Sequence, residues 1–256
     1  MNEEQLDRLL KKLRELFGEQ FIEFTCEAGR PDTITSEKLE VMKQNGITRI
    51  SINPQTMNDD TLERIGRAHT VEETVKSFEM ARAKGFDNIN MDIILGLPGE
   101  NLEHLQNTLQ AIRLLGPESL TVHTMALKRA SILHENNPQA NSQESCTSQM
   151  LELTEQFARQ QNMHPYYLYR QKHMLENLEN TGYCKPGYEC IYNVQIIEEK
   201  QTNIAFGADA ITKVIDVHTG LIKRQGNIKD LRLYIKNIEE QVQKKLALLA
   251  EFYDKK

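Results

Sequence analysis

The sequence predicts an α/β fold built around a parallel sheet, and three observations support that prediction. Short apolar segments alternate with longer segments whose apolar residues recur at helical spacing. The segments between consecutive strands are long enough for crossover helices, which favours parallel strands with right-handed connections. The run at residues 88–95 (NINMDIIL) is nearly all apolar in its second half, as parallel strands buried on both faces are. An open sheet and a barrel both satisfy this pattern.

Periodicity, capping residues and glycine stops place the elements of the first half in order. Strands are expected at residues 20–26, 47–52, 88–95 and 119–125. Helices are expected at residues 3–17, 36–46, 58–65, 70–85 and 101–115. The helix from Thr70 to Gly85 illustrates the reasoning, because threonine caps helix N-termini and glycine commonly ends helices.

The second half of the chain is less regular and predicts a smaller appended region. Residues 128–148 are polar, and we expect a loop there. The elements expected after it are a helix at 144–161, an aromatic strand near 164–174, a glycine-rich stretch at 181–190 and a strand pair within 191–217. Apolar residues at helical spacing from Leu231 to Leu249 predict a long closing helix.

The composition excludes several classes of protein. A formal net charge of −6 disfavours binding to a phosphate backbone, so we expect no nucleic-acid partner. Apolar runs stay far below the roughly 20 residues of a membrane span, and the charged first residues are unlike a secretory signal. Four cysteines without disulfide or zinc-ribbon spacing predict a reduced, cytoplasmic protein. No helix-opening GxGxxG or GxxxxGK[ST] motif supports a dinucleotide or P-loop site.

Polar residues gather at the predicted carboxyl ends of the strands, where α/β proteins bind their ligands. The first strand delivers Glu27, the second leads to Gln55, and the third contains Asp92. Arg67 lies one short helix after Gln55. Carboxylates can accept ribose hydroxyl hydrogens, an amide offers donor and acceptor edges, and arginine can clamp a carboxylate with two parallel bonds. The set suits a nucleoside joined to an amino acid.

Each of these residues also has a simpler interpretation. Glu27 and Arg67 are residue types that ordinarily lie on the surface, and GLPGE is a frequent kind of strand-to-helix turn. His123 inside a strand is more often a satisfied core residue than a ligand. Asp92 is harder to dismiss, because a buried, unpaired acid is costly. The constellation is therefore more informative than its members.

Four segments, taken in order, carry a family resemblance: EFTCEAGRPDTI, GITRISINPQTMNDDTLERIGRAHT, NINMDIILGLPGE and PESLTVHTMALKR. They resemble the oxygen-independent coproporphyrinogen III oxidases, or dehydrogenases, which are radical S-adenosylmethionine enzymes. GYCKPGYECIYNVQ and NIAFGADAITKV look closest to the coproporphyrinogen dehydrogenase branch of Gram-positive bacteria. The resemblance covers residues 3–235 and is most specific over 46–99.

The resemblance implies a partial (β/α) barrel with S-adenosylmethionine at its top. Residues 1–128 would form the barrel core, and residues 129–256 the remaining barrel elements and a small α+β C-terminal region. The implied reaction is oxidative decarboxylation of two propionates of coproporphyrinogen III to vinyls, giving protoporphyrinogen IX in haem biosynthesis. Carried over by motif, the cofactor contacts are Glu27, Gln55, Arg67, Asp92, Ala126 and, most distantly, Ile211.

The chain departs from the family in one respect that bears on chemistry. The family's CxxxCxxC loop, which holds a [4Fe–4S] cluster, is absent, and so is its GGTP motif. The cysteines stand at positions 26, 146, 184 and 190. We therefore expect the later portion of a family member, which binds no cluster and is inactive alone. A missing N-terminal half or an electron-transfer partner would complete it, and no residue of this chain is predicted to be catalytic or to bind a metal.

Two alternatives to a dehydrogenase portion remain open. The related haem chaperones carry an HNxxYW motif, whereas the nearest segment here is ECIYNVQII and the chain has no tryptophan. The other alternative is a non-catalytic remnant or interaction module, since missing strands would leave unpaired sheet edges that invite association.

Overall fold

The computed structural model describes residues 1–18, 21–126, 146–170, 174–217 and 219–253. They fall into two compact units, Met1–Cys190 and Ile191–Lys256, and each unit is described by itself. Among the helices of these residues, none combines the length and the apolar character that a membrane crossing requires.

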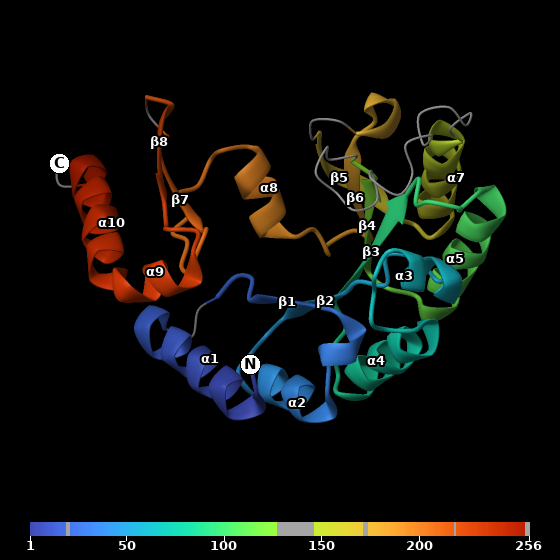
Figure 1. The fold of residues 1–256 in the computed structure, drawn as a ribbon, viewed down its shortest axis with the longest axis horizontal. Helices are drawn as coiled ribbons and strands as arrows, with labels where there is room; N and C mark the ends of the chain where they lie inside the picture. The colour runs from blue at the N-terminus through green and yellow to red at the C-terminus, as the bar shows by residue number, and fades with distance from the viewer. Residues whose placement is uncertain (19–20, 127–145, 171–173, 218, 254–256) are drawn as a thin grey trace. The chain divides into compact units, whose positions relative to one another are not determined.

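A six-stranded sheet in the order β1-β2-β3-β4-β6-β5 is the framework of the first unit (Figure 1). Its strands are β1 (Thr25–Gly29), β2 (Arg49–Ile52), β3 (Ile89–Leu95), β4 (Ser119–Thr124), β5 (His164–Tyr169) and β6 (Asn180–Cys184). The first four strands are parallel to one another, and β6 runs antiparallel to both β4 and β5. The predicted α/β class with a parallel sheet is confirmed.

Helices precede and connect the strands of this sheet and cover one of its faces (Figure 1). They are α1 (Glu3–Phe17), α2 (Ser36–Gln44), α3 (Asp59–Arg64), α4 (Val71–Ala83), α5 (Leu102–Leu115) and α7 (Thr147–Gln160), with 3-10 turns η1 (Pro31–Thr33) and η2 (Leu175–Asn177). Capping boxes at Asn2, Thr70 and Asn101 explain where three of them begin.

The two faces of the sheet differ in chemistry because successive side chains on a strand point to opposite sides. Ile89, Met91 and Ile93 of β3 are fully buried in the core with apolar residues of the neighbouring strands and of the covering helices. Asn90 and Asp92 lie between them in the sequence and therefore face the other side. That second face, which we call the polar face, carries the side chains listed here: Glu27, Arg49, Ser51, Asn90, Asp92, Ser119, Thr121 and His123.

The first compact unit ends at Cys190, whereas the division expected from the sequence, a barrel core to residue 128 followed by further barrel elements, stays a prediction. Strand pairing extends the first unit past residue 128, because Cys184 of β6 lies opposite Ser119 of β4 and β5 pairs with β6. The segment from α7 through β6 therefore belongs to the sheet of the first unit. Most of the loop predicted at 128–148 lies outside the described residues.

Three sequence predictions of secondary structure are wrong. The first strand is Thr25–Gly29 rather than 20–26, and Phe21 and Phe24, which stack on each other, lie before it. The glycine-rich stretch contains strand β6, which no strand prediction covered. The strand pair expected within 191–217 is displaced, because Ile191–Ile197 forms helix α8 and the hairpin strands are Ile211–Asp216 and Leu221–Gly226.

The second unit consists of α8, a hairpin and two helices. The hairpin is β7 (Ile211–Asp216) with β8 (Leu221–Gly226), and α10 (Ile238–Tyr253) packs against both strands. The predicted closing helix is divided, because α9 (Leu231–Lys236) ends with a C-cap at Asn237 before α10 starts.

Gly182 of β6 tests how closely the strand pair β5–β6 is packed. A Cβ atom at this position would lie 1.9 Å from Cε1 and 2.4 Å from Cδ1 of the Tyr167 ring. Gly182→Ala is expected to lower the free energy of unfolding by about 1–3 kcal/mol, as overpacked cores do. Gly226→Ala is the matched strand control, since its nearest neighbour would be 4.0 Å away. Equal unfolding free energies for the two variants in urea titrations would contradict this packing.

Candidate functional site

Gln55 is fixed by its backbone beside the end of β3. Its N–H donates to the carbonyl oxygen of Asp92 at 2.9 Å, and its own carbonyl accepts from the N–H of Ile94 at 2.9 Å. These two bonds form an isolated parallel bridge just past β2, and Gln55 adopts a φ of 70° there. Positive φ is uncommon for a residue other than glycine and costs energy. The bridge therefore holds Gln55 in a strained conformation at the carboxyl end of the strands.

The loop around Gln55 is tied to the GLPGE turn after β3. The Thr56 hydroxyl donates to Glu100 Oε1 at 2.5 Å, and Asn58 Nδ2 donates to the same oxygen at 3.0 Å. Arg64 Nη1 of α3 donates to the carbonyl of Pro98 at 2.6 Å. On the other side of the loop, the buried His69 places Nε2 3.2 Å from the carbonyl oxygen of Pro54. The turn and the Gln55 loop are therefore held together.

Asp92 belongs to a chain of polar groups across the polar face. Its Oδ1 accepts from Asn90 Nδ2 at 2.6 Å, and its Oδ2 lies 3.4 Å from Nε2 of His123 on β4. His123 Nδ1 lies 3.5 Å from the hydroxyl of Tyr169 on β5. The carboxylate orients the imidazole, and the imidazole can hold or pass a proton toward the phenol. Sequence reasoning identified Asp92 but took His123 for a core residue and did not single out Tyr169.

A second set of polar side chains on this face links strands β1 and β2. The Ser51 hydroxyl donates to Glu27 Oε2 at 2.6 Å, and Arg49 Nη1 lies 3.7 Å from Glu27 Oε1. The Glu27 side chain is 66% exposed, whereas the Arg49 side chain is 2% exposed. Nε and Nη1 of Arg49 have no hydrogen-bond partner among the described residues. A buried donor without a partner costs about 1–3 kcal/mol, so Arg49 is a place where a polar or anionic group would be stabilised.

The other residues that were predicted to contact the cofactor lie outside the Gln55–Asp92 bridge. Arg67 follows α3 and is half-buried, and its guanidinium makes no hydrogen bond to the residues that the structure describes. Ala126 follows β4 and forms an isolated antiparallel bridge to Met174. Ile211 is an exposed residue at the start of β7 in the second unit. The structure thus brings Gln55 and Asp92 together through backbone bonds, while Glu27 shares the polar face with Asp92.

Arg49 is a residue that sequence reasoning missed. It stands at the first position of β2, two residues before Ser51, so both side chains face the same side. The signal was available in the segment ITRISI, where an arginine alternates with apolar residues of a strand that is buried throughout. Pairing of Thr25 with Arg49 then aligns it with β1.

A [4Fe–4S] cluster does not fit the described residues. Such a cluster needs closely placed thiolates, and the cysteines at positions 26, 146, 184 and 190 lack the family's CxxxCxxC spacing. The single group of three or more potential ligand side chains found in the described part of the chain contains one cysteine, Cys184. S-adenosylmethionine is a different case, because the amide of Gln55, the carboxylate of Asp92 and the guanidinium of Arg67 are the donor and acceptor types that a nucleoside and an amino acid require.

Comparison with known proteins defines the class. Residues 2–112 match the family model of the radical SAM superfamily. The chain is 45% identical, over 98% of its length, to the oxygen-independent coproporphyrinogen-III oxidase-like protein HemZ of Bacillus subtilis. It is 30% identical, over 82% of its length, to the heme chaperone HemW of the same organism. It covers 51% of the first relative and 53% of the second, so it spans about half the length of these curated relatives.

A solved structure shows the same fold. The solved structure of coproporphyrinogen III oxidase HemN from Escherichia coli matches with a TM-score of 0.69 at 22% identity, covering 94% of this chain and 54% of that one. The structure shares its fold with this protein, and the matched family model identifies a radical SAM protein. Within that superfamily, the chain belongs to the oxygen-independent coproporphyrinogen III oxidase-like family, as the sequence motifs predicted.

Thr56 tests whether the GLPGE turn depends on the Gln55 loop. Thr56→Val keeps the shape of the buried side chain but removes the donor to Glu100, and we expect the free energy of unfolding to fall by about 1–3 kcal/mol. Thr61→Val is the control, because the hydroxyl of this buried threonine makes no hydrogen bond to described residues. Urea unfolding compares them, and a loss no larger in Thr56→Val than in Thr61→Val would refute the dependence.

Proposed function

We propose that this chain supplies the S-adenosylmethionine-binding rim of a coproporphyrinogen III dehydrogenase, which decarboxylates two propionates of a porphyrinogen oxidatively to vinyls. The observation that carries the proposal is the bridge that fixes Gln55 against Asp92 at the carboxyl ends of parallel strands. Ligands of α/β proteins bind at that edge. The relatives support the same assignment, because one is named as an oxidase-like protein of this reaction class.

The roles proposed for the rim residues follow from their chemistry. Asp92 would accept hydrogen bonds from ribose hydroxyls, and Glu27 would accept from the amino group of the methionine moiety. Arg67 has a guanidinium free to clamp the carboxylate of that moiety with two parallel bonds. Gln55 would bind through both edges of its amide, and Ala126 through its backbone. Ile211 lies in the second unit and stays a prediction of the family resemblance.

The chemistry of the complete family enzyme needs more than this rim. A cluster in the whole protein would take its thiolates from outside these 256 residues, because the cysteines described here do not form a set of ligands. We therefore propose that the chain binds and orients the nucleoside cofactor, and that another segment or a partner supplies the redox centre. A porphyrinogen is the proposed substrate of the whole protein, and the chain alone is proposed to be inactive.

Asp92 is the residue whose loss should weaken cofactor binding most. Calorimetric titration with S-adenosylmethionine is expected to show weak binding to the wild-type chain. Asp92→Asn should weaken it by at least about tenfold, which corresponds to about 1.4 kcal/mol. Asp87→Asn is the matched control, since Asp87 is an exposed acid just before β3. No binding by the wild type, or equal binding by Asp92→Asn, would contradict the proposed rim.

Anaerobic reconstitution with iron and sulfide tests whether the redox centre comes from outside this chain. The isolated chain is expected to hold far fewer than four irons after desalting, since a [4Fe–4S] cluster requires neighbouring thiolates that the chain does not bring together. Iron and acid-labile sulfide are measured together with the absorbance of the sample. A stable content of about four irons per chain would show that this chain carries its own cluster.

A haem chaperone is the second candidate, and the 30% identity to HemW over 82% of this chain favours it. Titration with haem, followed by absorbance, separates the two functions. Tight binding of haem by a chain that supports no decarboxylation would favour the chaperone, whereas absence of haem binding would favour the dehydrogenase portion.

A further inference from the structure

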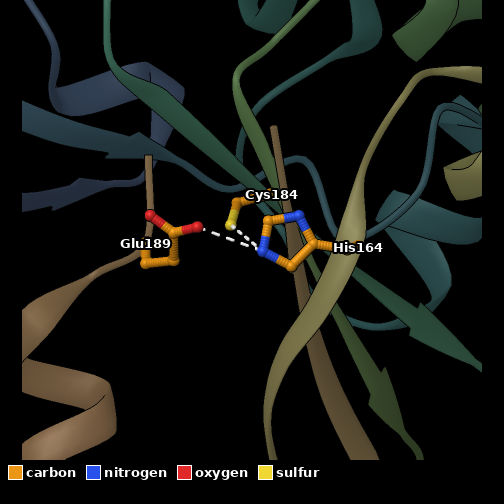
Figure 2. Close-up of side chains that lie close together, drawn as sticks. All are labelled: His164, Cys184 and Glu189. Atoms are coloured by element: carbon orange, nitrogen blue, oxygen red, sulfur yellow. Dashed lines mark hydrogen bonds and ion pairs between the residues drawn. The ribbon is translucent and has the colours of Figure 1, made fainter. Parts of the chain in front are cut away.

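A second cluster of ligand-type side chains lies toward the opposite end of the sheet from Gln55. His164 begins β5, Cys184 ends β6, and Glu189 lies in the turn that follows (Figure 2). Cys184 pairs with the first residue of β4, whereas Asp92 pairs further along that strand, with Thr121. All three side chains belong to the first unit. The cluster is therefore separate from the proposed cofactor rim and does not depend on it.

The three side chains converge on one point. His164 Nε2 lies 3.0 Å from Glu189 Oε1 and 4.0 Å from Cys184 Sγ, as Figure 2 shows. All three potential ligand atoms lie within 4.8 Å of one another. A tetrahedral zinc ion with bonds of about 2.0–2.3 Å places its ligands roughly 3.3–3.7 Å apart. Shifts of about an ångström in the side chains would complete that geometry.

A proton relay does not explain this arrangement. In a Cys-His-acid relay the imidazole uses its two nitrogens for two different partners. Here the carboxylate and the sulfur both approach the same atom, Nε2 of His164. One N–H cannot point well at both, whereas a cation placed between nitrogen, oxygen and sulfur is coordinated by all three. A plain His–Glu ion pair would likewise leave the position of Cys184 unexplained.

The environment supplies both access and support. Cys184 is fully buried, while the side chains of His164 and Glu189 are 46% and 36% exposed, so an ion can enter from solvent. The Gly187 N–H donates to Glu189 Oε1 at 3.4 Å. This backbone bond orients the Glu189 side chain toward His164.

We propose that His164, Cys184 and Glu189 bind one zinc-type divalent ion and leave its fourth position open to water. Nitrogen, sulfur and oxygen ligands in a set of three suit this borderline-soft ion. The ion would link the β5–β6 pair, in which His164 lies opposite Cys184, to the segment after β6 that carries Glu189.

Metal titration of the reduced, metal-free chain tests the site. One equivalent of Zn²⁺ should bind in competition with a chromophoric chelator, and Co²⁺ should give a thiolate-to-cobalt charge-transfer band. Cys184→Ser should abolish the band and weaken zinc binding by roughly 100-fold. Loss of a residue that only hydrogen-bonds to a metal ligand already lowers metal affinity by about 10–100-fold. His164→Gln, at a half-exposed position, provides a second variant should Cys184→Ser fail to fold.

Cys146→Ser is the matched control, because Cys146 is a half-buried free cysteine at the start of α7, outside the cluster. It should retain the cobalt band, the zinc affinity and the rise in melting temperature that a bound ion causes. Absence of stoichiometric zinc binding in the wild type would overturn the proposal. So would an unchanged band or affinity in Cys184→Ser or His164→Gln, or loss of the band in Cys146→Ser.

Discussion

The alternation of side chains across the parallel strands is the constraint on which the rest of the structure depends. Ile89, Met91 and Ile93 of β3 are buried under the helices, and each such burial stabilises the fold by roughly 1.5–3 kcal/mol. A slip of one residue would place Asp92 in the apolar core, where an unpaired carboxylate is very costly. Burial of the apolar residues therefore also places Asp92 and His123 on the opposite face, where Asp92 Oδ2 lies 3.4 Å from His123 Nε2.

The polar face is organised as pairs rather than as isolated groups. Ser51 donates to Glu27, Thr121 donates to Asn90, and Asp92 faces His123, so each pair links two neighbouring strands. Satisfied pairs of this kind fix side-chain geometry before a ligand arrives, which reduces the entropy that binding must overcome. The two basic residues Arg49 and Arg67 keep unpaired N–H groups among the described residues, and they are the points at which an anionic group would gain most.

Much of the fold and part of the candidate site could be predicted from sequence. The features that could not be predicted share one physical cause. Asp92 and Gln55 were predictable because the carboxyl ends of parallel strands meet at one edge. Strand β6 was missed because Gly182 weakens a strand pattern, and only the ring of Tyr167 across the pair explains the glycine. His164, Cys184 and Glu189 match no ligand motif in sequence, since the pairing of β5 with β6 is what brings them together. Local patterns could not reveal contacts that depend on tertiary pairing.

Backbone amide NMR of the chain during titration with S-adenosylmethionine tests the central claim most directly, because it reports where the ligand binds. The account predicts saturable shifts at Gln55, Asp92 and Ile94, whose amides and carbonyls form the bridge, and at His123 beside them. Amides around Cys184 should stay unperturbed. Shifts confined to residues away from the Gln55 bridge, or no saturable shift at millimolar ligand, would contradict the claim that this edge of the sheet is the cofactor site.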